Sequence, residues 1–435
     1  MGLIAYDNIH IGENFVMKKI LKILFTFFIL SISAQSSLAE STTLEELMKI
    51  GIINNPTLKV ARSRLGINDA QILTASLRIN PSFVTDNGIA EKTYRAGIEQ
   101  TFELGAKRKK RTKLEQIRKD VVISEIATTL IDVRSNIRIA YIQLYNAQQT
   151  LVAAQEILET TTKLSEIAKK RQLAGDIAVL DVLQAEIIMV KAKNDIQINK
   201  LAVNEAFNNL NAYLGQDLNR NIHLKEPSLL SEYNDAEFMP KDQSEDLINA
   251  LIEQAYVTRP EIKAILKNIE VERQRIVVAK ANIIPNLRLA AGPDIVLPGG
   301  EESNNLNMNV FVVAGVEIPV FNRQQGAIKE ALAQKELYEK ELDATKIAIA
   351  QEIKNAYAGI INNAESIRIY QNDLLPRAKD VLEKSKLSFQ EGKSSILMSL
   401  NSQEAYINTR FGYIQTLRNY EKSVSDLERA IGAAQ

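Results

Sequence analysis

A long stretch without helix-breaking residues limits the possible folds of this chain more than any other feature. Residues 107–172 contain neither proline nor glycine. Apolar residues recur in this stretch at alternating spacings of four and three, and they are Ile126, Leu130, Val133, Ile137, Ala140, Leu144, Ala147, Leu151, Ala154 and Leu158. Because this spacing places side chains on one face of a helix, it predicts a single helix about 100 Å long that packs through a coiled-coil seam.

The same plan occurs twice along the chain. Proline and glycine landmarks recur at similar spacings, and the pairs are Pro56 with Pro260, Pro81 with Pro285, Gly175 with Gly392, and Gly215 with Gly432. We therefore predict an internal two-fold repeat, with units at residues 40–215 and 244–435 and a linker at residues 216–243. A loop-like insertion near residues 292–305 accounts for the longer spacing of the later pairs.

The second unit carries its own apolar seam. It runs from Ile349 to Leu374 with heptad spacing, and Asn363 interrupts it once. Pro376 follows directly. Since proline lacks the backbone N–H that a helix interior requires, we expect a bend or kink at this residue.

Each unit changes partway from a helical pattern to a strand pattern. Apolar residues occupy the even positions from 306 to 320, which predicts a strand with one apolar face. A weaker alternation over residues 94–102 completes two predicted strand pairs, at about 82–102 and 286–320. Strands of this length and pattern cross bilayers in barrels, and they also occur at the edges of soluble sheets.

The lengths of the predicted helices indicate how they pack. Segments 56–79 and 178–213, placed end to end, are about as long as the helix at 107–172, and the second unit repeats this relation. Each unit is therefore predicted to be one long helix packed against two shorter collinear helices. The turns at residues 172–180 and 388–396 then form two tips at the pole opposite the strands. The predicted fold class is mainly α, with long helical hairpins and four strands.

The N-terminal residues have the layout of a secretory signal peptide. A basic segment begins at Met17, an apolar run covers residues 23–34, and small residues lead to Ala39. We predict a signal peptide at residues 1–39, with Met17 as a candidate start. No later segment has 18 consecutive apolar residues, so we expect an exported chain that is either soluble or part of an outer-membrane β-barrel.

Composition argues against several classes of function. Fifty-three basic residues balance 53 acidic ones, which does not favour nucleic acid as a partner. Cysteine is absent, and the two histidines are His10 and His223. No metal-ligand spacing, phosphate-binding loop or catalytic triad is present. The sequence therefore predicts a protein that is not an enzyme and has no cofactor and no metal site.

Several short motifs occur in the same order in both units. They are the helix starts at Asn55-Pro56 and Arg259-Pro260, the segments Glu103-Leu104-Gly105-Ala106-Lys107-Arg108 and Ile318-Pro319-Val320-Phe321-Asn322-Arg323, and the tip segments after Gly175 and Gly392. In this order they resemble the TolC-type outer-membrane efflux proteins over residues 41–432. The resemblance implies a homotrimer whose strands close a twelve-stranded membrane barrel and whose helices form a periplasmic tube. Four strands cannot close a barrel alone, which agrees with that expectation.

The resemblance also implies a function. Such a chain is expected to be the passive exit duct of a tripartite efflux system, docked to a periplasmic adaptor and an inner-membrane transporter. The segment from Glu103 to Arg108 resembles one common in the heavy-metal cation branch, from which it departs at Ala106. Type I protein secretion and drug efflux stay open as alternatives. A different class also stays open, namely an exported coiled-coil scaffold without a pore.

Candidate site residues lie at the two poles. Family resemblance assigns adaptor contact at the tips to Gly175, Asp176, Gly392 and Lys393, and tip gating to Asp181, Phe389, Ser394, Met398 and Asn401. Relatives close the tip with charged contacts and an acidic ring, whereas this chain has Phe389, Ser394, Met398 and Asn401 at those places. We therefore expect packing and neutral hydrogen bonds to hold this gate.

At the other pole we expect the junction between barrel and tube. Its candidate residues are Glu103, Gly105, Lys107, Arg108, Pro319, Asn322 and Arg323. The basic run from Lys107 to Lys113 is either a solvated helix start or a contact with anionic headgroups of outer-membrane lipid.

Overall fold

The structure is a computed structural model that describes residues 42–88, 93–219, 222, 224–225, 245–298 and 306–432. The predicted signal peptide, both histidines, most of the predicted linker and the end of the predicted insertion lie outside the described residues. Within these residues, no helix is apolar over enough length to cross a membrane.

The two repeat units contain the same series of elements. The first unit consists of α2 (Leu44–Asn54), α3 (Pro56–Ser76), β1 (Ser82–Gly88), β2 (Thr93–Phe102), α4 (Lys107–Leu173) and α5 (Val179–Leu214). The second unit consists of α7 (Glu245–Thr258), α8 (Pro260–Asn282), β3 (Leu287–Val296), β4 (Asn307–Val316), α9 (Gln325–Ile369), the π-helical turn η2 (Tyr370–Leu374), α10 (Leu375–Gln390) and α11 (Ile396–Ala430). The predicted internal repeat is therefore confirmed.

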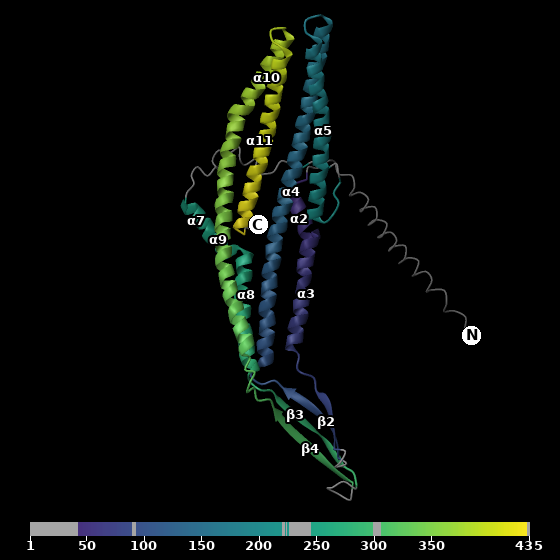
Figure 1. Cartoon of the computed structure of the whole chain (residues 1–435), viewed down its shortest axis with the longest axis vertical. Helices are drawn as coiled ribbons and strands as arrows, with labels where there is room; N and C mark the ends of the chain where they lie inside the picture. The colour runs from purple at the N-terminus through teal and green to yellow at the C-terminus, as the bar shows by residue number, and fades with distance from the viewer. Residues whose placement is uncertain are drawn as a thin grey trace, which may run out of the picture.

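The molecule is elongated, with the sheet at one end and two helical hairpin tips at the other (Figure 1). Helices α3 and α5 lie in line beside α4, and α8 and α11 lie in line beside α9. The long seam of α4 is buried or partly buried over its whole predicted length, from Ile126 to Leu158. The arrangement of one long helix against two shorter ones is thus present in both units.

The joint between each pair of collinear helices is held by a side chain that lies just before the start of the lower helix. Asn55 caps α3 by accepting from the Leu58 N–H at 3.0 Å, and its amide donates to the Tyr213 carbonyl near the end of α5 at 2.7 Å. In the second unit, Thr258 donates to the Ile431 carbonyl at 2.5 Å, just beyond α11. A partly buried polar contact at each joint fixes the two short helices end to end.

The four strands form one antiparallel sheet in the order β1-β2-β3-β4. The pairing of β2 with β3 joins the two units, with Thr93 opposite Val296 and Phe102 opposite Leu287. Strand β4 ends at Val316, earlier than the predicted limit of residue 320. Its last partner is Leu287, the first residue of β3, so Pro319 and Val320 lie beyond the end of the partner strand.

The bend expected at Pro376 takes the form of the π-helical turn just before it. A π turn adds one residue to the helix, which moves the apolar seam along by one position. Leu374, which the heptad pattern assigns to the seam, is 43% exposed, and the neighbouring Leu375 is partly buried instead. The seam then continues through Leu382, Ser385 and Phe389.

Candidate functional site

Both hairpin tips are built by the same backbone motif. Gly175 and Gly392 have φ values of 82° and 78°, a conformation that glycine adopts without a Cβ penalty. The Asp176 N–H donates to the Arg171 carbonyl at 2.9 Å, and the Lys393 N–H donates to the Ser388 carbonyl at 2.8 Å. These are the hydrogen bonds of a Schellman helix end, which reverses the chain in a few residues.

A buried apolar cluster lies directly behind the two tips. We call it the tip cluster, and its buried members are Leu164, Ala168, Val182, Ala185, Phe389, Ile396 and Leu400. They come from α4, α5, α10 and α11, so the cluster holds the two hairpins together. Phe389 is fully buried in it.

Arg171 links the same two hairpins and was not identified from the sequence. Its guanidinium donates to the Phe389 carbonyl at 2.5 Å and lies 4.9 Å from the centre of the Phe389 ring. It also approaches the Asp176 carboxylate at 3.9 Å. A charged contact therefore joins the tips, alongside the neutral packing expected there. Nothing in the local pattern marks Arg171, because its partner is far away in the sequence.

The other predicted gating residues do not gather at one place. Asp181 accepts from the Ala178 N–H at 3.2 Å and so caps the start of α5. The Ser394 hydroxyl is buried and has no hydrogen-bond partner among the described residues. Met398 is 56% exposed and Asn401 is also exposed, on the face of α11 away from the tip cluster. Of the predicted set, Phe389 alone belongs to that cluster.

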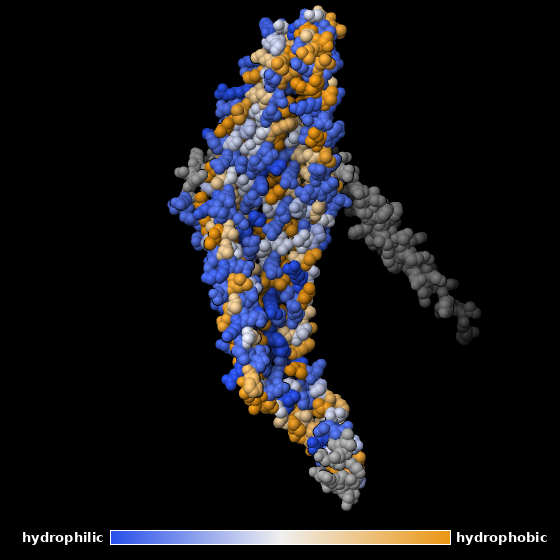
Figure 2. Space-filling model, viewed as in Figure 1, coloured by the Kyte–Doolittle hydropathy of each residue, from blue (hydrophilic) through white to orange (hydrophobic). Residues whose placement is uncertain are grey.

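The predicted contact residues at the tips are exposed. Asp176 and Lys393 point to solvent, and Lys393 pairs with Glu391 at 2.7 Å. Large apolar side chains surround them, including Leu173, Leu180 and Leu397, which are 84%, 64% and 50% exposed. Figure 2 shows this gathering of hydrophobic surface at the tip end of the molecule.

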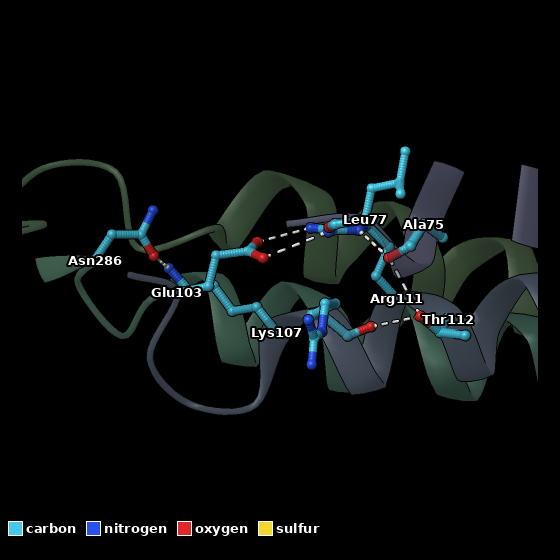
Figure 3. A network of polar contacts seen from close by, with 8 residues as sticks. Ala75, Leu77, Glu103, Lys107, Arg111, Thr112 and Asn286 are labelled. Carbon is cyan, nitrogen blue, oxygen red and sulfur yellow. Dashed lines mark hydrogen bonds and ion pairs between the residues drawn. The ribbon is translucent and has the colours of Figure 1, made fainter. Parts of the chain in front are cut away.

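At the opposite pole, the basic run divides into structural and exposed members. Lys107 is buried and donates to the Asn286 side chain at 2.6 Å, which ties α4 to the segment before β3. Arg111 donates to Glu103 at 2.7 Å and to the carbonyls of Ala75 and Leu77 (Figure 3). Arg111 holds the end of α3 against the start of α4, and Lys107 holds α4 against the segment before β3, so both cations are committed to the fold.

The two long helices begin with the same unusual residue conformation. Ala106 and Gln324, each the residue before its helix, both have φ of 56°, in the left-handed region. Gly105 also has positive φ, at 72°, and a side chain there would collide with Ile284. In the second unit, the Asn322 side chain accepts from the Gln324 N–H at 3.0 Å and supports the turn. Arg323 lies in this turn, where its N–H donates to Gln325 at 2.7 Å, and Pro319 is partly buried before it.

Midway along the helices, a buried carboxyl group lies between α11 and α4. Glu421 is 2% exposed, and its Oε1 has no hydrogen-bond partner in the described part of the chain. Burial raises the pKa of Glu421 to about 7, against the opposing effect of Arg138. Arg138 itself pairs with Glu428. Among the described residues, no three potential metal-binding His, Cys, Asp or Glu side chains come together.

The chain matches a known protein family over both repeat units. The family model described as "Outer membrane efflux protein" matches residues 52–216 and 251–433. The cobalt-zinc-cadmium resistance protein CzcC of Cupriavidus metallidurans is 21% identical over 348 residues, which covers 79% of each chain.

Solved structures share the fold at low sequence identity. A crystal structure of CusC, from work on folding and transmembrane channel formation, has a TM-score of 0.73 at 18% identity and covers 91% of this chain and 93% of that one. The open state of the Neisseria gonorrhoeae MtrE outer membrane channel has a TM-score of 0.70 at 16% identity, covering 89% and 88%.

Proposed function

Because the chain belongs to the outer membrane efflux protein family, we propose that three copies of it form the exit duct for heavy-metal cations in a tripartite efflux system. Members of this family are passive channels of the outer membrane and not enzymes. Transport energy then comes from an inner-membrane transporter, to which a periplasmic adaptor connects the duct.

The main support for a trimeric membrane barrel comes from the edges of the sheet. Strands β1 and β4 each have one side without a partner strand among the described residues. Along β4, Met308, Val310 and Val312 are 72%, 77% and 74% exposed. Open edges and apolar faces cannot both stay in water, whereas pairing with further copies satisfies the edges and a bilayer covers the apolar face. Four strands from each of three copies give a twelve-stranded barrel, and the helices continue it as a tube.

Two observations support heavy-metal cations as the substrate. The name of the relative CzcC refers to cobalt, zinc and cadmium resistance. The segment from Glu103 to Arg108, which resembles that of the heavy-metal branch, lies at the junction of sheet and helices. A wide duct does not select its cargo strongly, so the choice of substrate rests mainly with the transporter.

The tips are the proposed docking site for the adaptor. Gly175, Asp176, Gly392 and Lys393 form two exposed turns, and the apolar side chains around them offer surface that a partner can bury. Gating is assigned to the same end, with Phe389 packed inside and Asp181, Ser394, Met398 and Asn401 near the tips. At the sheet end, the exposed part of the basic run from Lys107 to Lys113 contacts lipid of the outer membrane.

The test is a deletion strain complemented with the full chain. Membrane fractionation with a heat-modifiable band on gels is expected for a trimer in the outer membrane. Resistance to cobalt, zinc and cadmium should fall on deletion and return on complementation. Sensitivity to dyes and detergents alone would assign the duct to drug efflux. A monomer that stays soluble after export would instead support a scaffold and contradict the proposal.

A further inference from the structure

A cavity of about 640 Å³ lies where the helices meet the sheet. It is open to solvent on one side and is lined by the segment after α3, the end of β2 and the first turn of α4. Three cationic side chains line it, namely Arg78, Arg108 and Lys109. Arg78 was not among the residues that the sequence singled out.

The positive charge of this cavity is not neutralised within the described chain. The one carboxylate in its wall is Glu103, and Arg111 holds both oxygens of that group, at 2.7 and 3.4 Å. Figure 3 shows this pairing beside the first turn of α4. No ion pair or side-chain hydrogen bond joins Arg78, Arg108 or Lys109 to any described residue. Three like charges in the wall of one cavity repel one another, and an anion bound between them reduces that cost.

The backbone adds to the positive potential. Helix α4 begins after Ala106 without a side-chain cap, and Ala106 and the first turn of α4 line the cavity, so no side chain of the protein satisfies the N–H groups at this helix start. The amino-terminal end of a helix carries partial positive charge, which strengthens the attraction of the three side chains for an anion.

Part of the cavity wall is apolar. Phe102 and Ile79 line it and are 47% and 43% exposed, and Leu77 and Leu104 lie next to them in the sequence with exposed side chains. A free inorganic ion makes no use of such surface. A molecule with a phosphate group and a hydrocarbon chain uses both parts, because the phosphate meets the cations while the chain covers the apolar residues.

We propose that this cavity binds the phosphate of a phospholipid headgroup and so anchors the channel at the membrane surface. The inference rests on the proposed function, since it requires the sheet to lie in a bilayer. Arg78 and Arg108 are the groups best suited to phosphate, because a guanidinium donates two parallel hydrogen bonds to it. Lys109 adds charge, while Lys107 and Arg111 hold the wall and are not free to bind the ligand.

The experiment measures lipid binding to the detergent-purified full chain by native mass spectrometry, with phosphatidylglycerol as the probe. Arg78→Gln alone, and Arg78→Gln with Arg108→Gln and Lys109→Gln, are compared with wild type. The matched control carries Lys59→Gln, Lys193→Gln and Lys200→Gln, which change the net charge equally at exposed sites without ion pairs in the described chain. We expect about tenfold weaker binding for Arg78→Gln, a larger loss for the triple variant, and no change for the control.

The results of this experiment test the lipid site separately from the proposed function. Equal lipid binding by wild type and the triple variant overturns the proposal, while a heat-modifiable membrane trimer in the same preparations leaves the proposed function standing. Inorganic phosphate that binds at the site as tightly as phosphatidylglycerol overturns the lipid assignment in favour of a free anion. If the triple variant does not assemble, Arg78→Gln still tests the site, because Arg78 is exposed and makes no contact that holds the fold.

Discussion

Arg171 at the end of α4 donates a hydrogen bond to the carbonyl of Phe389 at the end of α10, and its guanidinium lies over the Phe389 ring. The two residues belong to different repeat units, so this contact ties one tip to the other. It caps a carbonyl at a helix end and adds a cation–π contact beside the tip cluster. Arg171 therefore helps to hold the two hairpins together at the tips, in addition to the tip cluster.

Replacing Arg171 by alanine should loosen the tips. The loss of a charged hydrogen bond and a cation–π contact is expected to weaken the inter-hairpin contact by about 2 kcal/mol. In planar bilayers, the channel should show higher conductance and longer open times. Lys170→Ala is the matched control, because Lys170 is the exposed neighbour. Identical conductance of Arg171→Ala and wild type would show that the contact does not restrain the tips.

Block by divalent cations should be weak in this channel. Met398 and Asn401 stand where relatives are expected to carry an acidic ring, and neither provides a carboxylate. Without such a ring the aperture lacks a strong site for a divalent cation. Single-channel recordings with and without cobalt ions measure this, and Asn401→Asp should introduce block. Strong block of the wild-type channel would contradict the assignment of these two positions.

The repetitive parts of this fold were predictable from the sequence. Each was predicted from a local pattern. The seam from Ile126 to Leu158 follows from helical spacing, the tips follow from Gly175 and Gly392, and the strands follow from the alternation of apolar and polar residues. Local patterns are read correctly because each residue's role follows from its near neighbours along the chain.

The contacts that sequence analysis missed depend on distant partners or on a change of register. Arg171 and Lys107 take their roles from Phe389 and Asn286, which belong to the other unit. The π turn before Pro376 adds one residue to the helix and moves the buried seam from Leu374 to Leu375. A heptad pattern assumes constant spacing along the helix, so it assigns Leu374 to the seam. The basic run divides into buried and exposed members only once α3 and β3 are packed beside it.

An alanine at Gly292 should block assembly of the sheet. A Cβ there would lie 2.1 Å from the Ala96 carbonyl oxygen and 2.5 Å from the Gly97 Cα, both backbone atoms that cannot rotate away. Strand β3 would have to move away from β2, and the two repeat units would lose their pairing in the sheet. The heat-modifiable trimer band should be strongly reduced. Gly315→Ala is the control, since its Cβ would meet nothing closer than 3.8 Å. A normal band for Gly292→Ala would mean that these strands are farther apart.

A glycine at Ala106 should stabilise the protein. Ala106 has φ of 56°, which costs an alanine about 1–2 kcal/mol, whereas glycine adopts it freely but loses about 0.5–1 kcal/mol of chain entropy on folding. The expected net gain is about 0.5–1 kcal/mol, seen as a higher midpoint in thermal unfolding. Ala174→Gly, at a residue with φ of −79°, should give no gain. A lower midpoint for Ala106→Gly would show that this turn is not left-handed.

The buried carboxyl group of Glu421 makes stability depend on pH. Its pKa is about 7 in the folded chain, against an ordinary value of 4.5, because burial disfavours the charged form. Arg138 on α4 opposes this effect but is paired with Glu428, whose negative charge adds to it. Between these two pKa values the folded chain keeps a proton that the unfolded chain releases. The free energy of unfolding therefore falls as pH rises through this range.

Glu421→Gln should remove most of that decline. Since one pKa unit corresponds to about 1.4 kcal/mol, the variant is expected to be more stable than wild type at pH 8 by up to about 3 kcal/mol, and equally stable near pH 4. Burial also raises the pKa of Asp132, so a smaller decline in the same direction remains. Thermal unfolding at several pH values measures the effect. Glu404→Gln, at a side chain that is 62% exposed, should keep the wild-type pH profile. If Glu421→Gln keeps that profile too, the carboxyl group is ionised in the folded chain throughout this pH range.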